Sequence, residues 1–422
     1  MNYRETFKRY QAGTASDDEQ QWVEQEIERF HALEDYLSEE MDGAILSDIP
    51  QEEIARQETK QLRRTINRRL GRVVLTALLA MIGLYLFVFY VVSGVIDHTH
   101  YDPSRTELNQ SEAKAFQLPD VYYQLSAYTS LNHPHLGLES AYVESEHFGN
   151  HRINYRLRNL FSGEAQSHEI HLSRDRIENT GGVYDGRRRT GEIQGFDLIQ
   201  FPADRLDYGN RNRTSRYYLE HLSPLNYVSL SLVFDQDKSL EELYQMIDQN
   251  QAVKFIWAGV RIEHPEAVAE GRPVPLLGFR PEGEYTTYAG ELDDDKYPLF
   301  FLNDIFREDD YIDDYAATMA EGAAAHFKSR LQLLIDQAKF VEVMDPTTRS
   351  SQSYQASLDY IEAQGLATYG VVVVGNVERL NDLIEAIPYR SLYINQVLPA
   401  EPSIQLYANP VPVYRRSEPS GN

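Results

Sequence analysis

Hydrophobic residues gather in one uninterrupted run, residues 73–96, within a chain that is otherwise polar and acidic. This run, VVLTALLAMIGLYLFVFYVVSGVI, has no charged residue and no proline. As an α-helix it would be about 36 Å long at 1.5 Å per residue, enough to cross a hydrocarbon core of about 30 Å with some tilt. A helix also satisfies every backbone N–H and C=O group within the segment. The run therefore predicts a transmembrane helix, because a buried core helix is usually shorter and amphipathic.

Charged residues on the two sides of the run predict its orientation. Seven basic residues precede it, whereas Asp97 and Asp102 follow it and Arg105 is the first cation beyond. The seven are Arg56, Lys60, Arg63, Arg64, Arg68, Arg69 and Arg72. Because positive charge is retained on the cytoplasmic side, we expect residues 1–72 in the cytoplasm and residues 97–422 outside the membrane. The run starts too late and is too long for a cleaved signal peptide, so the prediction is a single-pass protein of the cell membrane.

The predicted cytoplasmic head, residues 1–55, has two amphipathic helical patterns. A basic juxtamembrane helix, predicted over residues 56–72, joins the head to the span. Ser16 and Glu19 form a capping box before the second pattern, which should end near Met41. The apolar positions are Tyr3, Phe7 and Tyr10 in the first helix, and Trp22, Val23, Ile27, Phe30, Leu37 and Met41 in the second. Two interpretations stay open: the stripes pack together in a helical hairpin, or much of this surface binds a partner helix in a groove.

The net charge adds to this picture of the head. The chain has a formal net charge of −25, and residues 1–53 hold 4 Lys and Arg against 15 Asp and Glu. An acidic head argues against direct nucleic-acid binding and suits a basic protein partner. The basic residues beside the span can meet anionic lipid headgroups. The chain has no cysteine, which excludes disulfides, cysteine-ligated zinc and thiol chemistry.

The part after the run begins with a polar stretch. Residues 97–115 contain Pro103 and predict a tether. Residues 116–225 are predicted to be rich in β-strands, because apolar and polar residues alternate in His151–Phe161 and, less clearly, in Glu169–Ser173.

An internal near-repeat dominates residues 226–400. Each copy has an apolar strand pattern, about eleven helical residues and a second strand pattern. The copies are YVSLSLVF, SLEELYQMIDQ and VKFIWAGV, then YGVVVVGN, VERLNDLIEAI and RSLYINQV. In the helices, Leu240, Leu243 and Ile247 have the same spacing as Leu380, Leu383 and Ile387. Two β-α-β units predict an α+β domain, either with a ferredoxin-like fold or with a related sandwich that has helices on one face of the sheet. Residues 401–422 are predicted to form a C-terminal tail.

The segment FKRYQAGTASDDEQQWVEQEIERFHALEDYL resembles the N-terminus of membrane-bound bacterial anti-sigma factors. Those proteins begin with a short helix, a Gly, an acidic capping segment and an amphipathic helix. In their zinc-binding branch this helix has a His followed by Cys-x-x-Cys. Here His31 lies in the helix but no cysteine follows, so we expect no metal. The second repeat, with its YGVVVVG strand, resembles the C-terminal region of the zinc-free sigma factor regulator family.

The resemblance implies a membrane-bound anti-sigma factor that sequesters an extracytoplasmic-function sigma factor through its head and senses an envelope signal through its outer domain. The residues expected to bind the sigma factor are Phe7, Tyr10, Trp22, Ile27, Phe30 and Leu37. Release would follow either cleavage by an intramembrane or site-1 protease or a conformational change. The alternative is a single-pass extracellular ligand-binding or scaffold protein whose head is only an anchor.

Motifs for catalysis are missing from the sequence. It has no G-x-S-x-G, no P-loop and no G-x-G-x-x-G. The pairs His133 with His135 and His168 with His171 lack identifiable further metal ligands. We therefore expect no enzymatic activity and no cofactor or metal.

Overall fold

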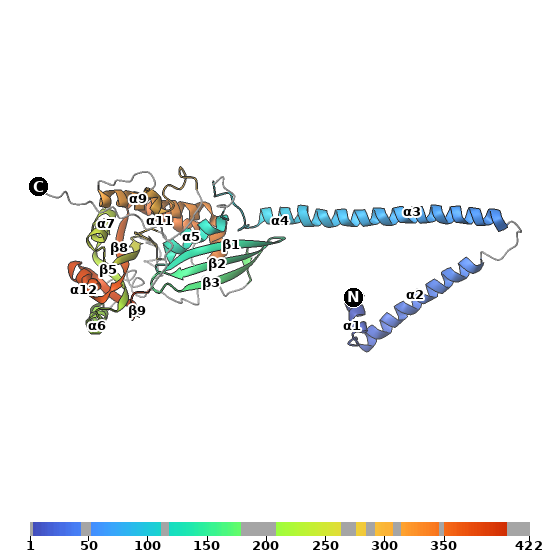
Figure 1. The fold of residues 1–422 in the computed structure, drawn as a ribbon, viewed down its shortest axis with the longest axis horizontal. Helices are drawn as coiled ribbons and strands as arrows, with labels where there is room; N and C mark the ends of the chain where they lie inside the picture. The colour runs from blue at the N-terminus through green and yellow to red at the C-terminus, as the bar shows by residue number, and fades with distance from the viewer. Residues whose placement is uncertain are drawn as a thin grey trace. The chain divides into compact units, whose positions relative to one another are not determined.

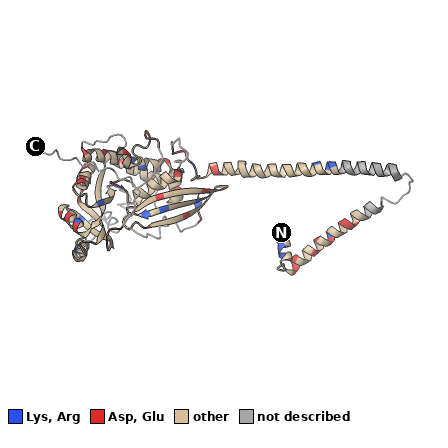
Figure 2. Cartoon of the chain, in the orientation of Figure 1, with Lys and Arg blue, Asp and Glu red and all other residues tan. Residues whose placement is uncertain are grey.

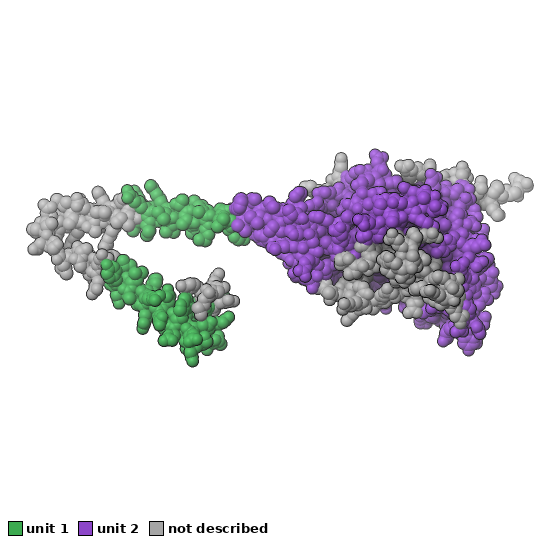
Figure 3. Space-filling view, turned by 180° about the vertical axis from the view of Figure 1, so that it is seen from behind, with its two compact units in different colours: residues 1–85 green, residues 86–422 purple. Residues whose placement is uncertain are grey.

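The computed structural model describes residues 3–43, 52–110, 118–178, 208–262, 276–283, 292–306, 314–345 and 350–402. The chain divides into two compact units, residues 1–85 and residues 86–422 (Figure 3). Helices and strands both contribute to the structure, and the α+β class predicted from the sequence is confirmed (Figure 1).

Two helices, α1 (Tyr3–Gln11) and α2 (Asp17–Gly43), begin the N-terminal unit (Figure 1). Gly13 lies in the turn between them at φ +69°, a left-handed conformation that glycine adopts without steric cost. The predicted capping box is present at the start of α2. The Ser16 backbone N–H donates to the Glu19 carboxylate at 3.1 Å, and the Glu19 N–H donates to Ser16 Oγ at 3.4 Å.

The apolar run lies in a helical stretch made of three consecutive parts. These are α3 (Glu52–Leu86), the π-helical turn η1 (Phe87–Val92) and α4 (Ser93–Thr99). Within the part of the chain that the structure describes, Asn67–Thr99 is the one helix long and apolar enough to cross a membrane. The predicted juxtamembrane helix and the predicted span are thus parts of the same helical stretch.

A five-stranded sheet forms the centre of the C-terminal unit, with strand order β7-β6-β8-β5-β9. The bounds are β5 (Tyr227–Ser239), β6 (Lys254–Val260), β7 (Gly278–Phe279), β8 (Ala367–Asn376) and β9 (Tyr389–Leu398). Strand β8 pairs antiparallel with both β5 and β6, and Leu230 lies opposite Val373. The strands of each expected β-α-β unit are therefore separated by a strand of the other unit, and both units share one sheet.

The repeated apolar stripes lie in the hydrophobic core. The helices of the two units are α7 (Leu240–Gln249) and α12 (Val377–Ala386). The six matched positions are all buried, with exposures of 0% to 8%: Leu240, Leu243, Ile247, Leu380, Leu383 and Ile387. Burying a Leu or Ile side chain contributes about 1.5–3 kcal/mol of transfer free energy, which explains why both helices turn the same stripe inward.

A second sheet, antiparallel and four-stranded, has the order β1-β2-β3-β4. The bounds are β1 (Leu136–His147), β2 (Asn150–Asn159), β3 (Ala165–Ser173) and β4 (Arg176–Ile177). The alternation predicted for this region is present in β2, where Ile153, Tyr155 and Leu157 are buried between more exposed neighbours.

Two helices correct the expectation that residues 116–225 are mainly strands. They are α5 (Asp120–Asn132) and α6 (Tyr208–His221). Every residue of α5 is buried, so its sequence shows no 3.6-residue alternation, and its tyrosines suggest a strand. α5 contacts β1 of one sheet and β7 of the other, whereas α6 contacts the edge strand β9.

The predicted tether is wrong over the residues that the structure describes, because this segment is packed on the C-terminal unit. Tyr101 is 6% exposed and its hydroxyl hydrogen-bonds the Gln124 side chain of α5. The Tyr101 backbone N–H donates to Asp175 Oδ1 at 2.6 Å. The Leu108 N–H donates to Asp120 Oδ1 at 2.9 Å. The buried Tyr101 side chain and these two hydrogen bonds to aspartate carboxylates therefore hold the segment after α4 against the rest of the C-terminal unit.

Three helices of the described chain lie between the two repeats: α9 (Tyr315–Asp336), α10 (Ala338–Met344) and α11 (Ser351–Gln364). α9 contacts α5, α7, α10 and α11 and brings them together (Figure 1). A short 3₁₀ helix, η5 (Leu302–Phe306), precedes α9. Most of the predicted tail over residues 401–422 lies outside the described residues.

The C-terminal unit should lose stability in acid because of His135. Burial lowers the pKa of His135 from its ordinary value of 6.5 to about 4. The unfolded chain then binds a proton below pH 6.5 that the folded state does not take up. The contribution of His135 to the free energy of unfolding should therefore fall by up to about 3 kcal/mol between pH 6.5 and 4. Urea unfolding of the unchanged chain and of His135→Gln across this range will measure this contribution as the difference between the two. The comparison with this variant separates His135 from Glu282, whose pKa burial raises to about 7 with an effect of opposite sign.

Candidate functional site

A hollow with mainly apolar walls lies between the two helices of the head. Its volume is about 250 Å³. It is lined by Phe7 of α1 and by Trp22, Val23, Glu26, Ile27, Phe30 and His31 of α2. An apolar hollow beside an amphipathic helix can take the side chains of a partner helix.

The contact between α1 and α2 is small and is centred on two buried side chains. Val23 is 3% exposed and Thr6 is 4% exposed. Arg9 and Glu19 form an ion pair across the two helices with an N–O distance of 3.4 Å. In the described residues the stripes thus meet near the start of α2, which agrees with the helical-hairpin interpretation for that part of the helix alone.

Most of the α2 stripe is left uncovered. Phe30 is 68% exposed, Leu37 is 51% exposed, and Phe7 of α1 is still 47% exposed. Leu33 and Tyr36, which flank the stripe, are also exposed. Large apolar side chains in a row on one helix are unusual for a surface that meets only water. The second interpretation, a surface for a partner, therefore accounts for the part of the stripe that α1 does not cover.

The structure brings together four of the six residues that the sequence selected. Phe7, Trp22, Ile27 and Phe30 all line the hollow, whereas Tyr10 and Leu37 lie outside its lining. Three further lining residues, Val23, Glu26 and His31, were not selected. Val23 was on the predicted stripe, so the helical period could have identified it. His31 is exposed and also borders the hollow.

Acidic side chains surround the apolar surface of α2. Asp17, Asp18, Glu24 and Glu28 are all exposed. Figure 2 shows Asp and Glu at several places along this helix. Charges of one sign around an apolar stripe steer a partner of the opposite charge toward it.

The C-terminal unit has a second hollow, of about 360 Å³, between α6 and the edge strand β9. The Arg211 guanidinium lies 5.2 Å from the centre of the Tyr393 ring there. Asn212 donates to the Arg390 carbonyl at 2.9 Å and accepts from the Leu392 N–H at 2.8 Å, so α6 covers part of the exposed edge of the sheet. Among the described residues, no group of three or more His, Asp or Glu is arranged to hold a metal ion.

These features define a class: a single-pass membrane protein with an acidic helical head before its apolar helix and an α+β unit after it in the sequence. Residues 219–395 match the family described as sigma factor regulator C-terminal. The matched segment covers both β-α-β units, apart from the last three residues of β9, and the helices between them. The match confirms the resemblance of the C-terminal region to the sigma factor regulator family, which is a regulatory and non-enzymatic kind of protein and suggests an anti-sigma factor role. No curated protein and no solved structure gives a match.

Proposed function

We propose that this protein sequesters an extracytoplasmic-function sigma factor on the apolar face of its cytoplasmic head, and that its C-terminal unit responds to a signal in the envelope. The exposed stripe of α2 is the observation that carries the proposal. The family match supports the same role. A head that served only to anchor an extracellular ligand-binding or scaffold protein would need no such stripe.

Sequestration by this surface requires binding alone. An amphipathic helix of the sigma factor would place its apolar side chains in the hollow beside Trp22 and along the stripe at Phe30 and Leu37. The acidic side chains around the stripe would meet the basic surfaces that a sigma factor uses for promoter DNA and polymerase. While the head covers those surfaces, the sigma factor cannot engage either one.

Co-expression tests the proposal directly. The full chain is produced together with an extracytoplasmic-function sigma factor of the same organism, and a reporter gene is placed behind a promoter of that sigma factor. We expect the reporter to stay off with the full chain and to turn on when residues 1–55 are deleted. Equal reporter activity in both strains would refute the proposed role.

The acidic residues of α2 should control how fast the sigma factor binds. Changing Asp17, Asp18, Glu24 and Glu28 together to the corresponding amides should lower the association rate and weaken its dependence on salt, with a smaller effect on dissociation. Surface plasmon resonance at several salt concentrations measures both rates. An unchanged association rate at low salt would show that these charges face away from the partner.

Reporter fusions should place the head in the cytoplasm. The prediction rests on the basic residues before the span, of which Arg68, Arg69 and Arg72 are exposed on α3. A reporter that is active only outside the cytoplasm should work when fused after residue 150 and fail after residue 50. The opposite pattern would place the candidate binding surface on the wrong side of the membrane for a sigma factor.

A further inference from the structure

The turn between β1 and β2 packs against the C-terminal end of the apolar helix. Residues 67–88 are all exposed, and burial begins at Phe89. The ring centroid of Phe89 lies 4.4 Å from that of His147 and 6.2 Å from that of Phe148. The helix residues at least partly buried from that point are Phe89, Val92, Ser93, Ile96, Asp97 and His100. Their three- to four-residue spacing shows that one face of the helix contacts the C-terminal unit.

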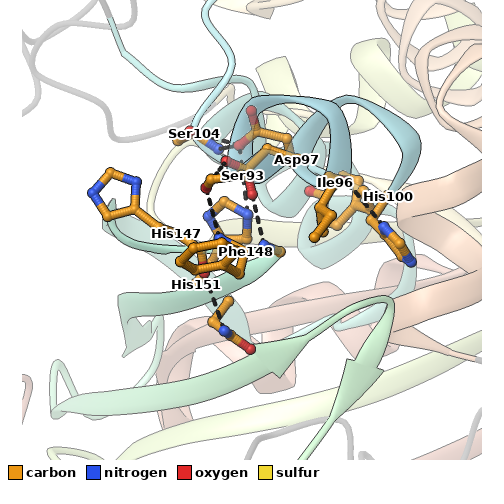
Figure 4. Close-up of polar contacts among 12 residues, drawn as sticks. Ser93, Ile96, Asp97, His100, Ser104, His147, Phe148 and His151 are labelled. Carbon is orange, nitrogen blue, oxygen red and sulfur yellow. Dashed lines mark hydrogen bonds and ion pairs between the residues drawn. The ribbon is translucent and has the colours of Figure 1, made fainter. Parts of the chain in front are cut away.

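Two helix side chains satisfy the backbone of this turn (Figure 4). Ser93 Oγ accepts from the Phe148 N–H at 2.9 Å, and Asp97 Oδ1 accepts from the Gly149 N–H at 2.6 Å. The Ser93 hydroxyl also donates to Asp97 Oδ2 at 3.1 Å. In water, the N–H groups of a two-residue turn could bond to solvent at little cost. Where water is scarce, the backbone N–H groups of such a turn need hydrogen-bond acceptors from the protein itself.

The turn also has bulky side chains at backbone positions with positive φ angles. His147, Phe148 and Gly149 have φ values of +64°, +56° and +75°. Asn-Gly or Asp-Gly is the ordinary choice for such a turn, and a bulky side chain there is an outlier that the surrounding structure must hold in place. A Cβ on Gly149 would lie 3.3 Å from Ile96 Cγ2, so the helix approaches the backbone closely here. An aromatic ring is thus kept at the turn despite its conformational cost.

The length of the exposed apolar helix places this turn at the level of the membrane. From Val73 to Val88 the helix covers only about 24 Å at 1.5 Å per residue, less than a hydrocarbon core of about 30 Å. Starting at Leu70, just after Arg69, extends this to only about 28 Å, and any tilt lowers the thickness covered. The membrane must therefore reach Phe89 and the residues that follow it, which are the residues that contact the turn.

We propose that the β1–β2 turn is a membrane-interface element that rests in the bilayer surface beside the span. His147 and Phe148 would lie at the boundary between acyl chains and headgroups. The adjacent β3–β4 turn joins the same surface, because the Arg174 N–H donates to the Gly149 carbonyl at 2.8 Å. Arg174 is exposed, and a cation at this level suits lipid phosphate. The partner is the lipid bilayer, and the proposal does not depend on a sigma factor.

The chain has no cysteine, so single cysteines can report the position of the turn. We would label His147→Cys with an environment-sensitive fluorophore in the full chain, reconstituted in lipid nanodiscs. Ser145→Cys, at an exposed position on the same hairpin, is a second site in case the first variant misfolds. The matched control is Glu164→Cys, exposed between β2 and β3, at the opposite end of the same sheet and about 30 Å away along β2. Circular dichroism compares the folds of the variants.

Lipids with brominated acyl chains should quench the label at position 147 several-fold more strongly than the label at 164. Iodide in the water should show the reverse order, and position 145 should follow position 147. Equal quenching by brominated lipid at 147 and 164, in variants with the native circular dichroism spectrum, would overturn the proposal. Protection from iodide at 147 without quenching by brominated lipid would also overturn it, because a protein contact would then cover the turn.

Discussion

Replacing Trp22 or Phe30 by alanine will release the sigma factor and raise transcription from its promoters. Trp22 lines the hollow between α1 and α2, and Phe30 continues the apolar surface at 68% exposure. Aromatic anchors at the centre of an interface typically cost about 2 kcal/mol or more on truncation, which corresponds to about a 30-fold weaker Kd. The measurement is reporter transcription in cells that express the full chain with its sigma factor.

The result is informative only if the head is still folded. Thr6 of α1 and Val23 of α2 are the buried side chains among the described residues of the two helices, and neither is changed by these substitutions. Circular dichroism of the purified variants must show the native helix content. Gln25→Ala is the matched control, because Gln25 is an exposed α2 residue outside the hollow. A folded Trp22→Ala, Phe30→Ala double variant that still represses fully would exclude this surface as the binding site.

Replacing Arg330 by alanine will unfold or severely destabilise the C-terminal unit. Arg330 is fully buried in α9. Its Nε donates to the Phe300 carbonyl at 3.2 Å and its Nη1 to the Ser126 carbonyl at 3.0 Å, and its guanidinium lies 4.6 Å from the centre of the Phe300 ring. The side chain thus joins α9 to α5 and to the segment before η5. Its loss leaves buried carbonyl groups without this donor and opens a cavity, at a cost of about 3–5 kcal/mol.

Such a loss is large beside the total stability of about 5–15 kcal/mol that is typical of folded domains. Chemical unfolding followed by fluorescence measures it, since Trp257 is buried in the same unit. Glu321→Ala, at an exposed position of the same helix, should change stability by no more than about 0.5 kcal/mol. If Arg330→Ala unfolds at the same denaturant concentration as Glu321→Ala, the guanidinium contacts are not important for the fold.

Local rules explain what the sequence could predict of this fold. The apolar run needed only a hydropathy pattern, and the Ser16 to Glu19 capping box needed only the identities of two residues. The helices α7 and α12 were predictable because each buries one face, which leaves a period of three to four residues in the sequence. The near-repeat then indicated that both units contribute to one sheet.

Other features depend on contacts that leave no local pattern. α5 is buried on all sides, so it lacks the alternation that identifies a helix. The segment after α4 is polar, and its attachment depends on the distant partners Gln124 and Asp175 of Tyr101. The strand order depends on pairing between the two units, such as Leu230 with Val373. The hydrogen bonds of Ser93 and Asp97 to the β1–β2 turn also join residues far apart in the sequence and leave no local pattern.

The candidate site was predictable in part for the same reasons. The helical period placed Trp22, Ile27 and Phe30 on one face of α2, and the structure finds all three beside one hollow. The extent of the hollow depends on where α1 packs, which a stripe alone does not indicate. For this reason Tyr10 was included although it lies outside the lining, and Glu26 was missed.

Direct binding of residues 1–72 to an extracytoplasmic-function sigma factor of the same organism is the decisive measurement of the proposed sequestration. We would titrate the purified sigma factor against the fragment by isothermal titration calorimetry, with Trp22→Ala as the comparison. We expect a one-to-one complex with the unchanged fragment and about 30-fold weaker binding with the variant. A fragment with native helix content that binds no sigma factor would contradict the proposed function.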